Sequence, residues 1–196
     1  MKKYCLLKGV IDYLHDLVYT QELERCSILY EVSDKNGNIF LEYDPTKEKK
    51  GEKIDRRQKC DSEDFHHIVH THPLSEYSYP SLEDIWRIVK EPSIKLSVIA
   101  TTWGIYTLKQ KEKFKGLDWI NDLRNNNHEK SFKDWLNGVL DDIGRLQDRK
   151  RNRNINDYVL TPVEYGDVNL FLSYINKQMD IEIKLYRWQD IRFSPI

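Results

Sequence analysis

Several features that define whole classes of protein are missing from this sequence. No run of apolar residues is long enough to cross a bilayer as a helix, so we expect no transmembrane span. The formal net charge is only -1 although 32% of the residues are charged, which argues against a dedicated nucleic-acid-binding protein. The sequence also has no internal repeat and no low-complexity tract, so a repeat architecture is not expected.

Cysteine is scarce as well. Cys5, Cys26 and Cys60 are the only three, and no Cys-x-x-Cys occurs. The odd count argues against a disulfide framework. Cys26 falls on an expected core strand and is interpreted as a small buried hydrophobic residue.

An uninterrupted apolar segment is also missing near the start of the chain. Residues 1–3 begin as a secretory signal peptide does, but Lys8, Asp12 and His15 interrupt any apolar stretch that follows. His15 itself is interpreted as an ordinary helix-surface residue. We therefore expect a protein of the reducing cytoplasm, with no contact to membranes.

What the sequence does contain is enough material for a substantial core. The 196 residues include five Trp and twelve Tyr, which is typical of one domain or of one domain with a small appendage. Apolar periodicity and turn signals predict an α+β arrangement. Its expected elements are a helix over 10–18, a hairpin of strands over 25–33 and 38–43, a strand over 65–71, a helix from 81, and strands over 94–101 and 103–108.

Two histidines stand at the end of an apolar run that is typical of a strand. Because side chains on a strand alternate between its faces, His70 and His72 are predicted to point the same way. Two imidazoles on one side of one strand can bind one metal ion. Pro73 cannot donate a hydrogen bond to a sheet, so we expect the strand to end directly after these side chains. A lone His-x-His on a strand is more often an ordinary surface or core pair.

A short distance further on, the segment Pro80-Ser81-Leu82-Glu83-Asp84 opens an amphipathic helix. Ser81 is a favourable N-cap, and Asp84 lies three residues later, where its carboxylate can reach back to the cap. The simplest interpretation is a capping box alone. Together with the two histidines at this spacing, however, Asp84 supplies a third ligand, and three protein ligands leave a fourth position on zinc for water.

This pattern resembles the JAMM/MPN-plus zinc metalloproteases, also called JAB domains. The family combines His-x-His-Pro, a spacer and Ser-x-x-Asp with an upstream glutamate, and the segment from Glu24 to Leu29 is similar to its Glu-x-Cys-Gly-Leu-Leu strand. The family glutamate maps onto Glu24, and not onto Glu22 or Glu31. Ser27 stands where the family has glycine, and residues 73–80 make a spacer one residue longer than usual, in a loop where insertions are cheap.

The resemblance covers about residues 5 to 110 and implies both a fold and a reaction. It implies a mixed sheet flanked by helices, with Zn²⁺ bound at a strand end by His70, His72 and Asp84. Glu24 would be the general base, and Ser81 could hydrogen-bond the oxyanion, although N-capping competes for the same hydroxyl. The implied activity is that of a peptidase or isopeptidase acting at the tail of a ubiquitin-like protein.

Two other functions are compatible with the same residues. One is a non-catalytic scaffold of the MPN type, which the presence of all four key residues argues against. The other is a nucleic-acid-associated protein similar to the RadC branch of the family, which would use the basic segments. Charge-dense residues 47–59 are interpreted as a solvated loop, with a substrate-facing flap as the alternative.

Nothing familiar marks the remainder of the chain. We therefore divide the chain into a metalloprotease-like core, residues 1–112, and a C-terminal extension, residues 113–196. The extension is predicted to contain an amphipathic helix over 132–146, a polar linker, a helix over 168–175 and a strand over 181–185. Its last strand could join the main sheet, recognise a protein partner or shield a sheet edge. We expect residues from about 156 onward to select a partner and to be dispensable for the metal site.

Overall fold

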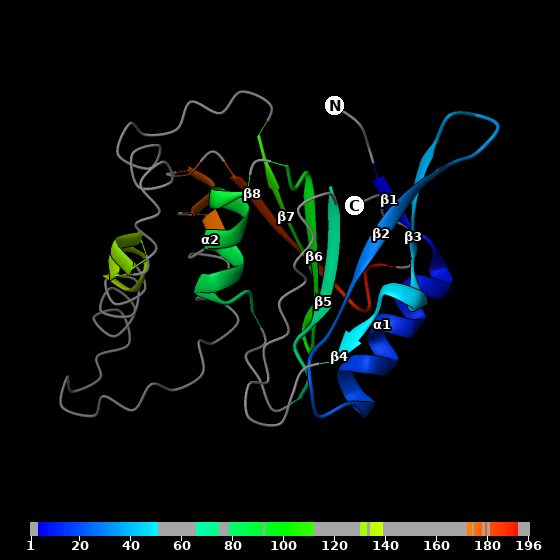
Figure 1. Cartoon of the computed structure of the whole chain (residues 1–196), viewed down its shortest axis with the longest axis horizontal. Coiled ribbons are helices and arrows are strands. Elements are labelled where there is room, and N and C mark those ends of the chain that lie inside the picture. The colour runs from blue at the N-terminus through cyan, green and yellow to red at the C-terminus, as the bar shows by residue number, and fades with distance from the viewer. Residues whose placement is uncertain are drawn as a thin grey trace.

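In the computed structural model, one mixed sheet runs through the protein (Figure 1). The structure describes residues 4–50, 66–74, 79–91, 93–111, 130–132, 134–138, 172–173, 175–177, 179 and 181–191. The strand order is β1-β3-β2-β5-β6-β7-β8, and β4 pairs with β2 beside this path.

The elements follow one another along the chain as the hydrophobic pattern predicts, with three short additions. They are β1 (Tyr4–Leu6), α1 (Lys8–Thr20), β2 (Arg25–Ser33), β3 (Ile39–Tyr43), the 3-10 helix η1 (Pro45–Lys47), β4 (Lys49–Lys50), β5 (His67–Thr71), α2 (Leu82–Lys90), β6 (Leu96–Thr101), β7 (Gly104–Gln110) and β8 (Ile181–Arg187). The α+β class is confirmed. The short elements β1, η1 and β4 were not predicted.

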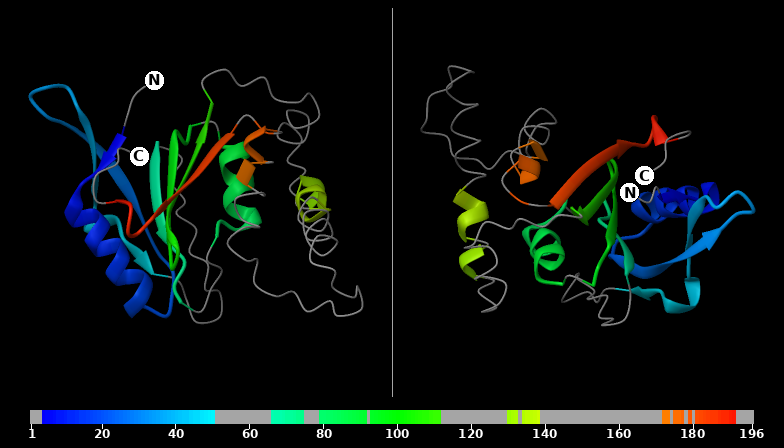
Figure 2. Two further views of the ribbon diagram at one scale, coloured as in Figure 1. Left: turned by 180° about the vertical axis from the view of Figure 1, so that it is seen from behind. Right: turned by 90° about the horizontal axis from the view of Figure 1, so that it is seen from above.

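Each face of the sheet has its own hydrophobic core, because successive side chains of a strand point to opposite faces. On β5, Ile68 packs with the apolar side of α2, whereas Val69 packs with the apolar side of α1. On β6, Ile99 lies in the core on the α2 side, and Val98 lies in the core on the α1 side. The two helices therefore cover opposite faces, as the views from behind and from above show (Figure 2).

The centre of the sheet is the parallel pair β5 and β6, with His70 opposite Ile99. All six residues of β6 are buried, as expected for a parallel strand that is covered on both faces. On the other side, β5 pairs with β2 in antiparallel register, with Cys26 opposite His70. The strand that carries the histidines is therefore held on both sides by paired neighbours.

The C-terminal extension contributes to the same sheet. β8 pairs with β7 along its whole length, from Ile181 opposite Gln110 to Arg187 opposite Gly104. Phe132 and Ile175, both in helical stretches, are completely buried in the core beside α2. Of the alternatives left open by the sequence, β8 thus joins the main sheet. The polar linker and most of the helix over 132–146 lie outside the described residues.

One expectation about cysteine is corrected. Cys26 is buried as predicted, but it is disulfide-bonded, and its partner lies outside the described residues. Cys5 is free. Within the described part of the chain, no helix has both the length and the apolar character needed to cross a membrane.

Candidate metal centre

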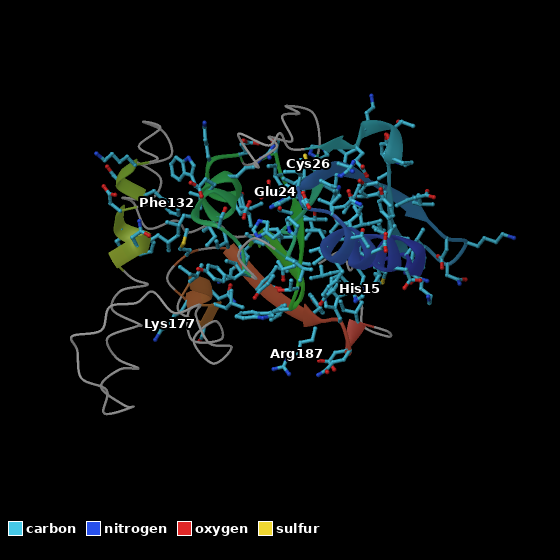
Figure 3. All side chains as sticks on the ribbon, turned by 90° about the horizontal axis from the view of Figure 1, so that it is seen from below. His15, Glu24, Cys26, Phe132, Lys177 and Arg187 are labelled. Atoms are coloured by element: carbon cyan, nitrogen blue, oxygen red, sulfur yellow. The ribbon has the colours of Figure 1, made fainter. Side chains whose placement is uncertain are left out.

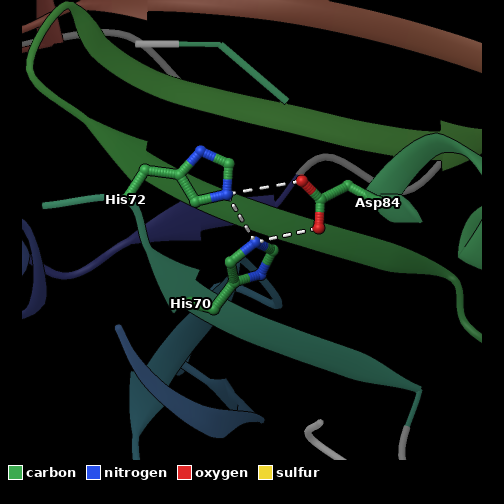
Figure 4. Close-up of side chains that lie close together, drawn as sticks. All are labelled: His70, His72 and Asp84. Carbon is green, nitrogen blue, oxygen red and sulfur yellow. Dashed lines mark hydrogen bonds and ion pairs between the residues drawn. The ribbon is translucent and has the colours of Figure 1, made fainter. Parts of the chain in front are cut away.

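Two imidazoles, those of His70 and His72, meet at the C-terminal end of strand β5. The Nε2 atoms of His70 and His72 lie 3.2 Å apart, and the carboxylate of Asp84 meets both of them (Figure 4). Asp84 Oδ1 is 3.0 Å from His70 Nε2, and Asp84 Oδ2 is 3.4 Å from His72 Nε2. The structure therefore brings together the three residues that the sequence predicts as ligands.

The N-terminal capping box of helix α2 positions the Asp84 carboxylate. Ser81 is the N-cap, and its Oγ accepts a hydrogen bond from the Asp84 N–H at 3.2 Å. In return, Asp84 Oδ2 accepts from the Ser81 N–H at 2.7 Å and from the Ser81 hydroxyl at 2.8 Å. The predicted capping box is thus present, and it fixes the rotamer of the same carboxylate that faces the histidines.

The separations among these atoms can be compared with the demands of zinc. A tetrahedral ion with bonds of about 2.1 Å holds its ligand atoms about 3.4 Å from one another. The two Nε2 atoms lie 3.2 Å apart, each is 3.0 or 3.4 Å from a different Asp84 oxygen, and one ligand atom from each residue lies within 4.8 Å of the other two. Two imidazole nitrogens and one carboxylate oxygen also form a ligand set that zinc prefers. The residues present therefore fit a tetrahedral zinc ion with one position left over.

A further contact sets the tautomer of one ring. His72 Nδ1 lies 3.1 Å from the carbonyl oxygen of Tyr79, and a carbonyl can only accept a hydrogen bond. His72 therefore carries a proton on Nδ1, which leaves a lone pair on Nε2 for a cation. This type of outer contact is what orients metal-binding histidines in general.

The charge of the site is set by Asp84. Burial by itself would raise the pKa of this carboxyl, but the imidazoles of His70 and His72 hold the pKa well below its usual range. Asp84 is therefore ionised at neutral pH. An anionic oxygen and two imidazole nitrogens converge on one point, which is an environment that favours a divalent cation.

Glu24 reaches the centre from the neighbouring strand. Cys26 lies opposite His70, so continuation of the same antiparallel register puts Glu24 opposite His72 and on the same face of the sheet. Glu24 is buried, and its Oε1 lies 3.9 Å from His72 Nε2. The Glu24 carboxylate therefore lies beside the point where His70, His72 and Asp84 converge.

A hydrogen bond that the sequence did not predict joins the two strands at this point. The backbone ladder of β2 and β5 ends at Cys26 opposite His70. One residue further on, the N–H of Arg25 donates to Thr71 Oγ1 at 3.0 Å. Thr71 lies between the two histidines and is completely buried. Its hydroxyl thus holds the segment that contains Glu24 in place, beyond the last backbone pair between β2 and β5.

The other candidate side chains lie away from the centre. Glu22 is exposed, whereas Glu31 accepts a hydrogen bond from Tyr4 at 3.3 Å and lies 3.4 Å from His67 Nε2. His66 shares the parity of His70 but contacts the carbonyl oxygen of Ser93 at 2.8 Å. The structure therefore separates Glu24 from the two glutamates near it in sequence.

Comparison with known proteins adds nothing to this assignment. A scan against protein-family models, a search of curated proteins and a search of solved structures each gave no match.

Proposed function

We propose that this protein is a zinc-dependent peptidase or isopeptidase of the JAMM type, which hydrolyses an amide bond at the tail of a ubiquitin-like protein. The observation that carries the proposal is the convergence of His70, His72 and Asp84 at zinc-compatible separations, with buried Glu24 beside them. The resemblance of the sequence motif supplies the substrate class.

Each of the four residues has a distinct task in this proposal. His70, His72 and Asp84 would hold the ion. When bound, zinc supplies Lewis-acid chemistry that polarises a carbonyl and acidifies a water molecule. Glu24 would accept a proton from the attacking water as general base and would return a proton to the leaving amine. Its burial keeps bulk solvent away from the carboxylate during this transfer.

Ser81 has two roles in this proposal, which are to hold the Asp84 carboxylate and to donate to the oxyanion. Its hydroxyl carries a single proton, which is donated to Asp84 Oδ2 in this structure. Holding the ligand carboxylate is therefore its task before substrate arrives. Donation to the oxyanion requires the hydroxyl to turn toward the substrate, with the Asp84 side chain still held by the Ser81 N–H.

The decisive experiment separates the base from the metal ligands. In Glu24→Gln the ion should stay at full stoichiometry, while the hydrolysis rate falls about 100-fold or more because the base has been removed. The measurement is zinc content together with release of a fluorescent reporter that is fused to the tail of a ubiquitin-like protein. Glu22→Gln is the matched control, because Glu22 is exposed and two residues away. A Glu24→Gln variant that retains most of the wild-type rate would refute the assigned base.

A further inference from the structure

A disulfide lies directly beside the metal centre. Cys26 is disulfide-bonded and buried, and it lies opposite His70 across the β2–β5 pair. Residues directly opposite one another on paired strands have Cβ atoms about 4.5–5.5 Å apart. Because side chains two residues apart on a strand share a face, Cys26 also lies on the same side of the sheet as Glu24. Figure 3 shows Glu24 and Cys26 close together at the start of β2. The disulfide is therefore next to both the proposed base and one of the proposed metal ligands.

The sequence identifies the partner of Cys26. The chain has three cysteines, and Cys5 is free, which leaves Cys60 as the second half of the bond. The bond therefore closes a loop of the chain that contains β3, η1 and β4. It joins this loop to the sheet at the residue opposite His70.

Cys26 is the last residue of β2 in the backbone ladder with β5. On its other side, the start of β2 pairs with the two residues of β4. One residue before Cys26, the N–H of Arg25 donates to Thr71 Oγ1 at 3.0 Å, and Glu24 comes directly before that. Strand ends open more easily than strand centres. A covalent bond at Cys26 therefore restricts the motion of the segment that carries Glu24.

The rest of the fold does not depend on this bond. Among the described residues, Cys26 belongs to neither of the two hydrophobic clusters that form the core. The far half of β2 pairs with β3 from Leu29 to Ser33, well away from the disulfide. Permanent disulfides are typical of small domains with little core, whereas an isolated bond in a protein with a full core is more typical of redox sensing. The position of the bond thus favours a local effect on the metal centre.

An external thiol is required to open the bond. Cys5 lies opposite Phe40, which lies opposite Val32, six residues along β2 from Cys26. At about 3.3 Å per residue this is a distance of about 20 Å, so Cys5 is out of reach for exchange within the chain. A low-molecular-weight thiol is therefore the reductant that we consider.

We propose that the Cys26–Cys60 disulfide is a redox switch of the metal centre, in which the oxidised form holds Glu24 beside the metal ligands and reduction releases it. Because Cys26 is buried, a thiolate of the reductant attacks the sulfur of Cys60, and Cys26 leaves as a thiolate that takes up a proton. A second thiol attacks the mixed disulfide on Cys60. This step yields the Cys60 thiol and the disulfide of the reductant, so two thiols supply the two electrons.

Reduction should act on the base and spare the metal ligands. His70, His72 and Asp84 come from β5 and α2, so zinc should stay bound in both states. The hydrolysis rate should fall about tenfold or more, since a displacement of about 1 Å in a positioned group can cost about 100-fold. The effect on hydrolysis rests on the proposed function, whereas the loosening of the strand can be measured without a substrate.

The experiment places the full zinc-loaded chain in mixtures of reduced and oxidised glutathione. Alkylation followed by mass spectrometry gives the fraction of Cys26 that is reduced. Zinc content, reporter hydrolysis and amide hydrogen exchange are then measured in each mixture. With reduction we expect faster exchange at the Arg25 amide, unchanged exchange at Val98 in the centre of the sheet, one zinc per chain, and a lower rate that recovers on reoxidation.

Three variants assign the effect to this bond. Cys26→Ala should behave as the reduced protein in every mixture. Cys60→Ser breaks the same bond and leaves the side chain of Cys26 in place, so it gives the same answer if Cys26→Ala fails to fold. Cys5→Ser is the matched control, because Cys5 is free, and it should keep the full response to glutathione.

The outcomes separate this inference from the proposed function. A bond that stays intact in fully reduced glutathione, or a rate that ignores its reduction, overturns the switch while the proposed function stands. Faster exchange at Val98 as well as at Arg25 also overturns it, because the bond would then support the whole fold. A bond that opens reversibly and loosens Arg25 alone, in a protein that hydrolyses no reporter in either state, supports the local effect and counts against the proposed function.

Discussion

Two polar clusters flank the start of β2, and they are built in opposite ways. Around Glu48, three described side chains are donors: Arg25 donates to Oε1 at 2.8 Å, and the hydroxyls of Tyr13 and Tyr43 both donate to Oε2. At the metal centre, the Asp84 carboxylate instead meets two imidazole nitrogens, from His70 and His72. The side chains of the first cluster are typical of a structural carboxylate, and those of the second are typical of a metal-binding site.

This difference shows how a structural cluster can be told from a functional one. Both contain a buried or half-buried carboxylate with several partners, so burial and hydrogen-bond number do not distinguish them. The chemistry of the partners does, because guanidinium and phenol groups near a carboxylate act as donors, whereas an imidazole nitrogen is also a metal ligand. Substitutions in the two clusters should therefore have different effects on metal content and on stability.

The largest expected effect is on metal binding. Purified protein should contain close to one zinc per chain, and His70→Ala or His72→Ala should reduce this to a small fraction, because two ligands rarely hold zinc against competing water and chelators. Elemental analysis after dialysis measures it.

His66→Ala is the control for this loss, since His66 lies one residue before the same strand and contacts the Ser93 carbonyl instead. Equal zinc in the wild type and in a His70→Ala, His72→Ala double variant would remove the basis for a metal centre here.

In the Glu48 cluster the effect should be on stability alone. Glu48→Gln removes the charge that three donors share, and we expect a loss of about 1–3 kcal/mol in the free energy of unfolding. Urea denaturation measures the loss, and zinc content should stay unchanged. Glu22→Gln, which alters an exposed glutamate, should change neither quantity. Zinc loss in Glu48→Gln would show that the two clusters are coupled.

Substitution of Thr71 should have a smaller effect on both clusters, because its hydroxyl accepts a hydrogen bond from the N–H of Arg25. Thr71→Val keeps the shape of the side chain but leaves that N–H without its acceptor, at a cost of about 1 kcal/mol or slightly more. We expect full zinc content, faster hydrogen exchange at the Arg25 amide in NMR measurements, and a reduced rate of hydrolysis. Thr71→Ser, which keeps the hydroxyl, should restore both. Failure of Thr71→Ser to restore them would mean that packing, and not the hydrogen bond, is what Thr71 contributes.

The smallest effect concerns alkaline pH. Burial and the hydrogen bond to Glu48 raise the pKa of Tyr13 to about 12. Because the folded pKa is above the usual value of about 10, this tyrosine stabilises the fold below pH 10, and its contribution is lost as the pH rises toward 12. Tyr13→Phe should therefore destabilise the protein slightly at pH 8 and flatten the decline of stability above pH 10. Unfolding curves at several pH values test this, and an unchanged alkaline decline would assign it to other groups.

Much of the metal centre could be predicted from local sequence, since its geometry depends on short-range rules. The alternation of a strand sets His70 and His72 on one face, and the capping box sets Asp84 three residues after Ser81. The position of Glu24 depends on the pairing of two distant strands, which local patterns do not specify. It was predicted through a resemblance, and the register of β2 and β5 supplies a physical reason for it.

The remaining features depend on contacts that leave little trace in the sequence. β1 has three residues and pairs with β3 in parallel, so it is too short for a periodic signal. The bond from Arg25 to Thr71 uses a backbone donor, which any residue at position 25 except proline would provide. The pattern of β8 predicted a strand, but its place beside β7 follows from tertiary packing. Removal of the residues from about 156 onward would take away β8 and expose the edge of β7, so their proposed dispensability for the metal site has to be tested on a truncated protein that stays soluble.

The capping box at Ser81 has a consequence for how quickly the centre can take up an ion. Asp84 Oδ2 accepts from the Ser81 N–H and hydroxyl before any cation arrives, so its rotamer is selected when α2 forms. If zinc binds here, its capture would involve no search of side-chain conformations by the carboxylate, and the association rate would be set by diffusion and by dehydration of the ion. In Ser81→Ala the carboxylate would have to be ordered anew at every encounter, so slower uptake, more than faster release, would mark the loss of the cap.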